Sequence, residues 1–264
     1  MRRQKLSNRQ KSSNGVILYE GPSIFDGSPI VQIATGLRKP TQNRKVRNAI
    51  QVWTIPSQEH PLEAIRRDSA YSVCRDCAIS DLCYVNRITL GAIYGAYRRG
   101  AYPAVPVHRI PELLPSYMVW RLGAYGNPSA VPYPKVMGKL SKLGVQWLSY
   151  EHAWSHVTQS HRAVSMASCE TLDQAIGAAS RGWRSYTVVP LGETKRAIKV
   201  LKRAGIKAIA CPYNASNPAT ITCDICRLCD GKHGDDDKRP SIIAEIHGSP
   251  NVIGSRNKAL AILQ

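Results

Sequence analysis

The fold class follows from the stretch RSYTVVPLGETKRAIKVLKRAGIKAIAC, residues 184–211. An apolar run at 184–189 is followed by an amphipathic segment at 193–205 that ends on glycine, and then by a second apolar run at 206–211. Short apolar strands joined by an amphipathic helix with a C-terminal glycine are typical of a parallel β-α-β unit. The stretch therefore predicts an α/β protein whose helices cover a parallel sheet.

The same alternation recurs through the second half of the chain. Further strands are predicted at 118–124, 145–151, 163–168 and 241–247, and further helices at about 130–143 and at 171–182. Thr171 is the predicted N-cap of the second of these helices. Six strands are too few for a complete eight-stranded barrel but enough for a partial one. We predict a partial (βα)6 barrel-like parallel sheet, with an open doubly wound sheet as the alternative.

The first part of the chain predicts a β-rich extension that contains cysteines. Strands are expected at 16–20, 29–34 and 49–55, and a helix at 87–100. Residues 1–15 are polar and basic, which predicts a disordered tail. We therefore expect a tail at 1–15 and a single α/β domain at 16–264, divided into an N-terminal extension at 16–116 and a barrel-like core at 117–264.

Composition narrows the functional classes. The 264 residues carry a formal net charge of +18, and no apolar run is long enough to cross a membrane. The basic N-terminus is not followed by the apolar segment of a secretion signal, so a cytoplasmic protein without membrane association is expected. In that compartment cysteines stay reduced, and clustered cysteines favour metal binding over disulfides.

Four cysteines in the last third of the chain predict one closed metal site. Cys223, Cys226 and Cys229 follow a C-x2-C-x2-C spacing, and Cys211 lies upstream at the predicted end of a strand. Four thiolates complete either a zinc site or the ligand set of a [4Fe-4S] cluster. The spacing is closer to that of bacterial ferredoxins than to paired zinc knuckles, so iron-sulfur is favoured and zinc is the alternative.

Three earlier cysteines predict a second site that is short of one ligand. Cys74, Cys77 and Cys83 follow a C-x2-C-x5-C spacing. Three thiolates can bind three irons of a cluster and leave the fourth for another ligand, or can bind zinc together with a distant residue. His152, Cys169, a small molecule or nothing could complete the set. The isolated Cys169 is also explained as a small buried residue.

Other candidate residues lie at predicted strand ends, where ligands collect in parallel α/β folds. His152 and Asn127 are the candidate catalytic residues, and His247 ends the last predicted strand. Gly123 lies near the end of the strand at 118–124 and Gly126 just after it, and both would let the backbone approach a cofactor closely.

Basic residues concentrate near the N-terminus and predict contact with a phosphate backbone. Residues 1–48 contain ten lysines or arginines against Glu20 and Asp26. The candidate nucleic-acid-binding residues are Arg2, Arg3, Lys5, Arg9, Lys11, Arg38, Lys39, Arg44, Lys45 and Arg47.

Several motifs together resemble phage and plasmid proteins related to the gene-product-88 group. They cover most of the chain: GPSIFDGSPIVQIATG (21–36), CRDCAISDLCYV (74–85), RLGAYGNPSAVP (121–132), YEHAW (150–154), MASCETLDQA (166–175), RGWRSYTVV (181–189) and CDICRLCDG (223–231). The resemblance to that group implies no particular activity. The chain is also loosely similar to radical SAM barrels. This looser resemblance implies a partial (βα)6 barrel, a cluster held by three cysteines with an open iron, and an auxiliary four-cysteine cluster.

The resemblance also implies SAM as a cofactor. The chain departs from the usual C-x3-C-x2-C spacing of radical SAM proteins and lacks a clear glycine-glycine-glutamate stretch, so SAM binding does not follow from its own residues.

The sequence supports two main hypotheses. The first is an iron-sulfur, radical-SAM-like phage or plasmid protein acting on or near nucleic acid. The second is a non-catalytic, zinc-stabilised nucleic-acid-binding protein with a role such as replication; a redox sensor is a third reading.

Overall fold

The computed structural model describes residues 7–41, 43–67, 69–77, 83, 85–113, 119–132, 145–215, 220–246, 253–254, 257 and 260. The chain divides into two compact units, residues 1–75 with 85–146 and residues 76–84 with 147–264. The division differs from the predicted boundary at 116/117, because the strand predicted at 118–124 belongs to the first unit. It also separates Cys74 from Cys77 and Cys83.

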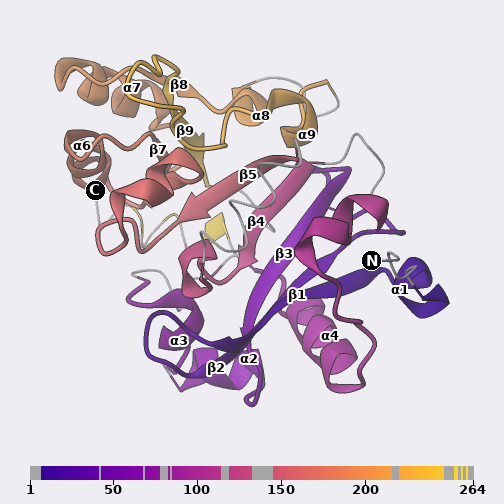
Figure 1. Cartoon of the computed structure of the whole chain (residues 1–264). Coiled ribbons are helices and arrows are strands. Elements are labelled where there is room, and N and C mark those ends of the chain that lie inside the picture. Colours follow the sequence, from indigo (N-terminus) through magenta and orange to yellow (C-terminus); the bar gives the residue numbers. More distant parts are fainter. Residues whose placement is uncertain are drawn as a thin grey trace. The chain divides into compact units, whose positions relative to one another are not determined.

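The first unit is built around a four-stranded sheet in the order β1-β2-β3-β4 (Figure 1). Its elements are α1 (Asn8–Ser12), β1 (Gly15–Pro22), β2 (Pro29–Thr35), β3 (Ala49–Pro56), α2 (Pro61–Arg66), α3 (Tyr71–Cys74), α4 (Arg87–Arg98), the 3-10 turn η1 (Val107–Leu113), β4 (Val119–Tyr125) and the 3-10 turn η2 (Pro128–Ala130). β1, β2 and β3 are antiparallel neighbours, whereas β4 runs parallel to β3. Every residue of β3 is buried, which explains why its apolar residues do not alternate with exposed polar ones.

The N-terminal segment differs from the predicted tail. Residues 8–12 form α1, and Ser7 caps it with a capping box that includes Gln10. A reciprocal cap satisfies the amide groups that a polar segment would otherwise leave to water. Arg9 also donates a hydrogen bond to the carbonyl of Gly100, so part of the basic segment packs on the first unit.

The second unit contains a parallel sheet in the order β5-β6-β7-β9-β8. Its elements are β5 (Gln146–Glu151), the 3-10 turn η3 (Gln159–Ala163), β6 (Met166–Cys169), α6 (Leu172–Ser180), β7 (Ser185–Val189), α7 (Thr194–Arg203), β8 (Ala208–Ala210), α8 (Pro212–Ala215), α9 (Cys223–Cys226) and β9 (Ser241–Glu245). The helices α6 and α7 pack through one hydrophobic cluster on Ala167, Cys169 and Ile243. A mixed α/β architecture with parallel strands is therefore confirmed.

Two details differ from the sequence prediction. β9 lies between β7 and β8, whereas a barrel would keep these strands in chain order. Residues 163–165 precede β6 instead of opening it, because the 3-10 turn η3 ends at Ala163. Most of the helix predicted at about 130–143 lies outside the described residues. None of the helices in the described part of the chain has the length and apolar character needed to span a membrane.

Candidate metal centre

The four-thiol group consists of Cys211, Cys223, Cys226 and Cys229, all in the second unit. Cys211 directly follows β8, and its amide donates to the carbonyl of Ile243 at 2.7 Å. Cys223 and Cys226 are the first and last residues of α9 and are half-buried, whereas Cys211 and Cys229 are buried. All eight cysteines lie among the described residues and are reduced thiols. The local fold thus brings the distant Cys211 to the C-x2-C-x2-C run.

Cys229 is the centre of this group. Burial raises the pKa of its thiol to about 12, and the charges of Cys223, Cys211 and Cys226 act in the same direction. A hydrogen bond from the Tyr150 hydroxyl opposes this rise. Thiols that repel one another as thiolates, and that are held together away from water, are stabilised when a metal displaces their protons.

A buried arginine lies beside the four-thiol group. The side chain of Arg184 is only 4% exposed, and its guanidinium donates to the carbonyls of Leu228, Gly231 and Pro240 at 2.6–3.2 Å. Burial lowers the pKa of Arg184, and the charge of Cys229 is among those that raise it. The guanidinium therefore ties the loop after Cys229 together and supplies positive charge next to the thiols.

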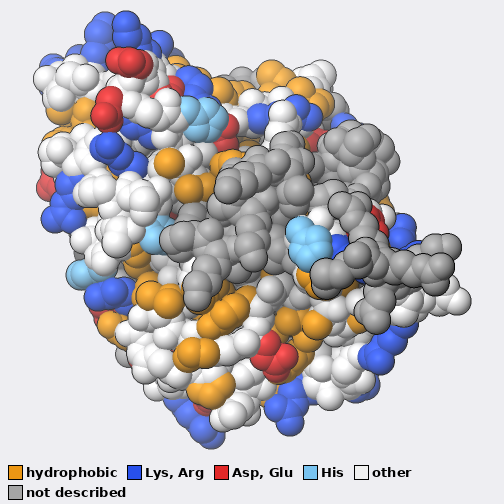
Figure 2. All heavy atoms as spheres, viewed as in Figure 1, with side chains coloured by type: hydrophobic (Ala, Val, Ile, Leu, Met, Phe, Trp, Pro, Cys, Tyr) orange, Lys and Arg blue, Asp and Glu red, His pale blue; other side chains and the backbone are white. Residues whose placement is uncertain are grey.

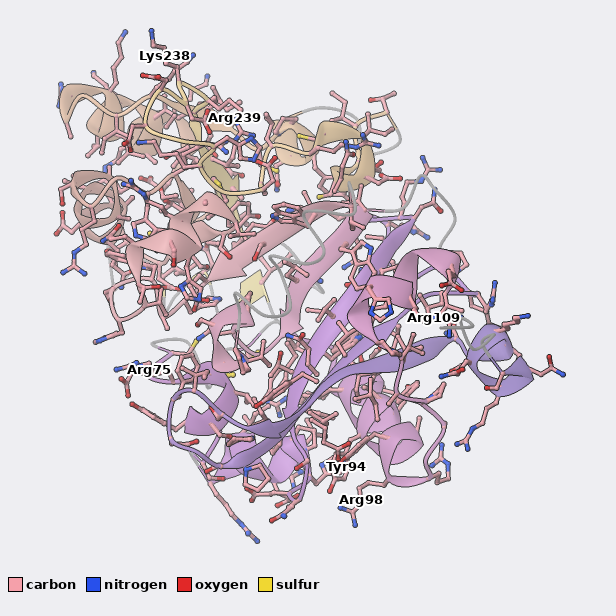
Figure 3. The ribbon with its side chains drawn as sticks, viewed as in Figure 1. Arg75, Tyr94, Arg98, Arg109, Lys238 and Arg239 are labelled. Atoms are coloured by element: carbon pink, nitrogen blue, oxygen red, sulfur yellow. The ribbon has the colours of Figure 1, made fainter. Side chains whose placement is uncertain are left out.

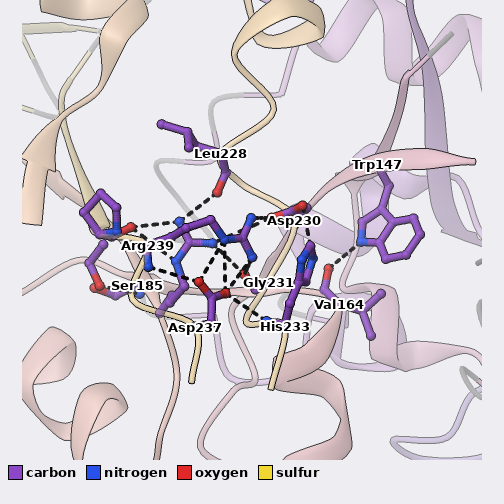
Figure 4. A network of polar contacts seen from close by, with 12 residues as sticks. Trp147, Val164, Ser185, Leu228, Asp230, Gly231, His233, Asp237 and Arg239 are labelled. Carbon is purple, nitrogen blue, oxygen red and sulfur yellow. Dashed lines mark hydrogen bonds and ion pairs between the residues drawn. The ribbon is translucent and has the colours of Figure 1, made fainter. Parts of the chain in front are cut away.

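Acidic residues complete this polar network (Figure 4). Asp230 accepts from Arg239 at 2.6 Å and lies 3.6 Å from Arg184, and Asp237 accepts from Arg239 at 2.6 Å. Hydrogen bonds from Arg239 hold the pKa of Asp237 well below its usual range. The network fixes the chain between the last cysteine and β9 in one conformation.

The turn after Cys74 shares a positive φ with the turn after Cys226, but the ψ values differ, at −149° for Arg75 and 20° for Arg227. In the segments C-R-D-C (74–77) and C-R-L-C (226–229), a four-residue helix ends on the first cysteine and the next arginine has a positive φ. The φ values are 54° for Arg75 and 56° for Arg227. Figure 3 marks Arg75 at the end of α3. A non-glycine residue in this region is uncommon, and such strain concentrates at functional sites.

Cys77 and Cys83 belong to the second unit, where Cys77 meets the predicted residue His152. The Cys77 Sγ atom lies 4.0 Å from His152 Nδ1. The same nitrogen lies 3.0 Å from Glu170 Oε1. Burial disfavours the imidazolium, but the hydrogen bonds and charges of Cys77 and Glu170 outweigh it, so the pKa of His152 lies well above its ordinary value. The structure thus brings His152 to the first cysteine set.

The other candidate residues have different surroundings. Asn127, in the first unit, donates from Nδ2 to the carbonyl of Cys74 at 2.9 Å, while its amide donates to Val73 at 2.7 Å. It braces the end of α3 rather than ending a strand of the second unit.

Gly126 has φ +73°, and a Cβ there would lie 2.5 Å from the Thr54 carbonyl, so close packing alone requires glycine. Gly123 likewise has φ +70°.

Cys169 is fully buried within the hydrophobic cluster beneath α6 and α7. Its thiol donates weakly to the Ala167 carbonyl at 3.7 Å, and burial raises its pKa well above the ordinary value. These surroundings match the reading of Cys169 as a small core residue and place it away from a ligand role. His247 lies outside the described residues.

The candidate nucleic-acid residues are partly described. Arg2, Arg3 and Lys5 lie outside the described residues. The others are in the first unit and are exposed except for the half-buried Lys45: Arg9, Lys11, Arg38, Lys39, Arg44 and Arg47. The Arg38 guanidinium donates to the Lys11 carbonyl, and the amides of Arg38 and Lys39 donate to Asn14. Figure 2 shows Lys and Arg side chains scattered over the visible face, with fewer Asp and Glu.

Sequence reasoning missed three residues that support the thiols: Tyr150, Glu170 and Arg184. Glu170 lies two residues after the strand predicted at 163–168, so its position near a strand end was a usable signal. Tyr150 and Arg184 have no local signal, because their roles depend on contacts with residues far along the chain. Within the described ranges, no three His, Cys, Asp or Glu side chains are arranged as the ligands of one metal ion.

Comparison with protein-family models, with curated proteins and with solved structures finds no significant match.

Proposed function

We propose that the chain is an iron-sulfur protein in which Cys211, Cys223, Cys226 and Cys229 hold a [4Fe-4S] cluster. The observation that carries this proposal is the gathering of four thiols around the buried Cys229. Four like ligands, two of them buried and two half-buried, without disulfides, have no structural use that we can identify other than coordination. Thiolates are the ligands that iron-sulfur clusters require.

The surroundings fit an anionic cluster. Tyr150 offers a hydroxyl to Cys229, and the Arg184 guanidinium lies next to it in a buried position. Hydrogen bonds to cluster sulfurs and nearby charge are two of the means by which proteins set a cluster's stability and potential.

Zinc is the alternative occupant. A zinc ion needs four ligand atoms at about 2.0–2.3 Å from one point. Each thiolate of a four-iron cluster binds its own iron, so a cluster needs no such convergence of side chains. Together with the C-x2-C-x2-C spacing, this favours the cluster, and metal analysis decides between the two.

The radical-SAM-like part of the proposal concerns the first cysteine set. Cys74, Cys77 and Cys83 would hold a cluster with one iron not bound by cysteine. The run β5-β6-β7, in chain order and parallel, supports a barrel-like segment in the second unit, and His152 follows its first strand. SAM and a substrate enter the proposal only through the sequence resemblance.

The nucleic-acid part of the proposal rests on the basic segment, which we define as residues 36–48. It contains Arg38, Lys39, Arg44, Lys45 and Arg47 and no Asp or Glu. Contacts from Arg38 and Lys39 join it to α1 and the turn after it, which adds the exposed Arg9 and Lys11. Such a surface attracts a phosphate backbone without reading its sequence.

Anaerobic purification tests the cluster. We expect a brown protein with absorption near 400 nm, and with iron and acid-labile sulfide in about equal amounts, as a four-iron cluster requires. Cys229→Ala should lose this iron, whereas Cys169→Ala, which removes a core thiol, should keep it. A colourless protein with stoichiometric zinc would reject the iron-sulfur proposal. If iron is present, release of 5′-deoxyadenosine from SAM and a reductant tests the radical branch.

Salt-dependent binding tests the nucleic-acid surface. Replacing Arg38, Lys39, Arg44 and Arg47 with Gln should weaken binding to DNA or RNA and reduce the slope of log K against log salt by about 3–4 units. The matched control replaces Lys195, Arg196, Lys199 and Lys202 of α7 with Gln, which removes the same charge from another surface. Equal loss in both variants would mean that net charge, not the basic segment, determines binding.

A further inference from the structure

Residues 230–240, which we call the strap, connect the four-thiol group to β9 without an apolar anchor. Residues 230–239 read DGKHGDDDKR and contain no apolar side chain, and residues 233–236 are exposed. Segments with few buried apolar contacts open locally at a low cost in free energy. The position of the strap therefore depends on its polar contacts and on the buried Cys229 that precedes it.

The chain around the start of the strap lies against β5 and the connection from β5 to β6. The Cys229 carbonyl accepts from the amide of Ser149, in β5, at 2.8 Å. Three residues later, the Lys232 amide donates to the Arg162 carbonyl at 2.7 Å. Two backbone hydrogen bonds thus hold this part of the chain to two segments of the second unit.

Gly231 makes the closest contact of the strap. It has φ +88°, and a Cβ built on it would lie 2.6 Å from the backbone nitrogen of Val164, so only glycine fits there. The Val164 carbonyl accepts from Trp147 Nε1, in β5, at 2.9 Å (Figure 4). The strap therefore packs on a piece of backbone that is itself fixed to β5.

Arg184 connects the strap to the charge of the four-thiol group. Its guanidinium donates to the carbonyls of Gly231 at 2.6 Å and Pro240 at 2.8 Å, near the two ends of the strap. A buried cation is stable only with compensating negative charge nearby, and Cys229 is close enough for its charge to act on Arg184. Thiols lose their protons when they bind a metal, so a filled site supplies this charge and an empty site removes it.

We propose that the strap is a conformational switch controlled by the four-thiol site. It is closed over the connection between β5 and β6 when the site is filled, and it opens when the site is emptied. The inference rests on the proposed iron-sulfur function and adds a regulatory role for that site. Opening also takes the Cys229 carbonyl away from Ser149, three residues before His152, so loss of the bound group reaches the end of β5.

Hydrogen exchange of the full chain tests the switch. Exchange is followed by mass spectrometry at single amides, first in the iron-loaded protein under anaerobic conditions and then after a chelator has removed the iron, with the cysteines kept reduced. We expect the amides of Ser149 and Lys232 to exchange at least about tenfold faster in the emptied protein, whereas those of α6 and α7 keep their rates. Equal exchange in the two forms, or one uniform increase throughout the second unit, would overturn the inference.

Cys226→Ala empties the site by another route. It removes a ligand but leaves Cys229 and the contacts of the strap in place, so the Lys232 amide should exchange as fast as in the chelated wild type. A Lys232 amide that stays protected in iron-free Cys226→Ala would contradict the switch.

Two glycine variants test the contact with Val164. Gly231→Ala should open the strap while the iron is retained, because its Cβ meets the Val164 backbone. Gly234→Ala is the matched control, since Gly234 has nearly the same φ, +85°, but a Cβ there meets nothing within 4 Å. It should exchange as the wild type does. Equal opening in both variants would contradict the role of this contact. If Gly231→Ala does not fold, the chelated wild type and Cys226→Ala decide.

The outcomes separate this inference from the proposed function. Protein that holds a cluster but keeps the strap protected after the cluster is removed contradicts the switch and leaves the proposed function standing. Protein that binds no metal or cluster under any condition contradicts both.

Discussion

Tyr150 and His152 lie two residues apart at the end of β5, and each contacts a different cysteine set. Tyr150 is hydrogen-bonded to Cys229 of the four-thiol group, whereas His152 Nδ1 lies 4.0 Å from Cys77 Sγ. Residues two apart in an extended strand are separated by about 6.6 Å along the backbone. Within the second unit, the end of one strand therefore contacts both Cys77 and the four-thiol group.

Magnetic coupling between the sites is the first consequence. If both hold clusters, the fully reduced protein should give an EPR spectrum broadened by spin-spin interaction. Cys229→Ala and Cys77→Ala, which each remove one of the proposed cysteine ligands, should give simple single-cluster signals. Additive spectra in the doubly reduced wild type would show that the two sites do not interact.

Tyr150→Phe should change the potential of the four-thiol cluster without changing its iron content. The hydroxyl donates to Cys229, and a donor to cluster sulfur stabilises the reduced, more negative form. Removing it should shift the midpoint potential to a more negative value in a redox titration. Tyr186→Phe is the control, because Tyr186 packs edge-on against the Tyr150 ring at a centroid distance of 4.8 Å. Equal shifts in both variants would assign the effect to packing.

Arg184→Met should destabilise the metal-free chain by about 3–5 kcal/mol, measured by urea unfolding. The side chain is 4% exposed and satisfies three carbonyls, so its loss leaves buried acceptors without donors and Asp230 with one fewer cation. Arg196→Met is the control, since Arg196 is 58% exposed and forms only a surface ion pair with Glu193. The control should change stability by less than about 0.5 kcal/mol.

Periodicity in the sequence predicted most elements of the second unit. β7 and α7 lie at Ser185–Val189 and Thr194–Arg203, within the predicted ranges, and Thr171 caps α6 through a hydrogen bond from the Gln174 amide. These features depend on local apolar spacing and capping. β9 pairs between β7 and β8. Strand pairing depends on contacts between residues far apart in the chain, so local periodicity does not predict it.

The candidate site was predictable only in part for the same reason. Cysteine spacing identified the two thiol sets, and the strand end singled out His152. Tyr150 and Arg184 lie far along the chain from Cys229, so only the tertiary contacts reveal them. The catalytic role of Asn127, predicted from its place after a strand, stays a prediction; in the structure its side chain donates to the carbonyl of Cys74.

Low pH should lower the folding stability of the second unit because it protonates Asp237. Hydrogen bonds from Arg239 depress the pKa of Asp237, so the folded chain favours the carboxylate. This stabilisation is fully present above the unfolded value of about 3.8 and is lost as the pH falls below it. Asp237→Asn should be less stable at pH 7 by about 1–3 kcal/mol and should lose less stability between pH 5 and pH 3. Asp235→Asn, at an 84% exposed side chain, should follow the wild type.

The backbone at Arg227 provides a test of the C-R-x-C turn itself. Its φ of 56° and ψ of 20° place it in the left-handed region, which costs an L-residue about 1–2 kcal/mol. Glycine removes this cost and a β-branched side chain increases it. Arg227→Gly should therefore keep the iron content of the four-thiol site and be at least as stable as the wild type, whereas Arg227→Val should lose iron. Both variants lack the guanidinium, so equal iron loss would show that the side chain, and not the turn that aligns Cys226 with Cys229, is what the site requires.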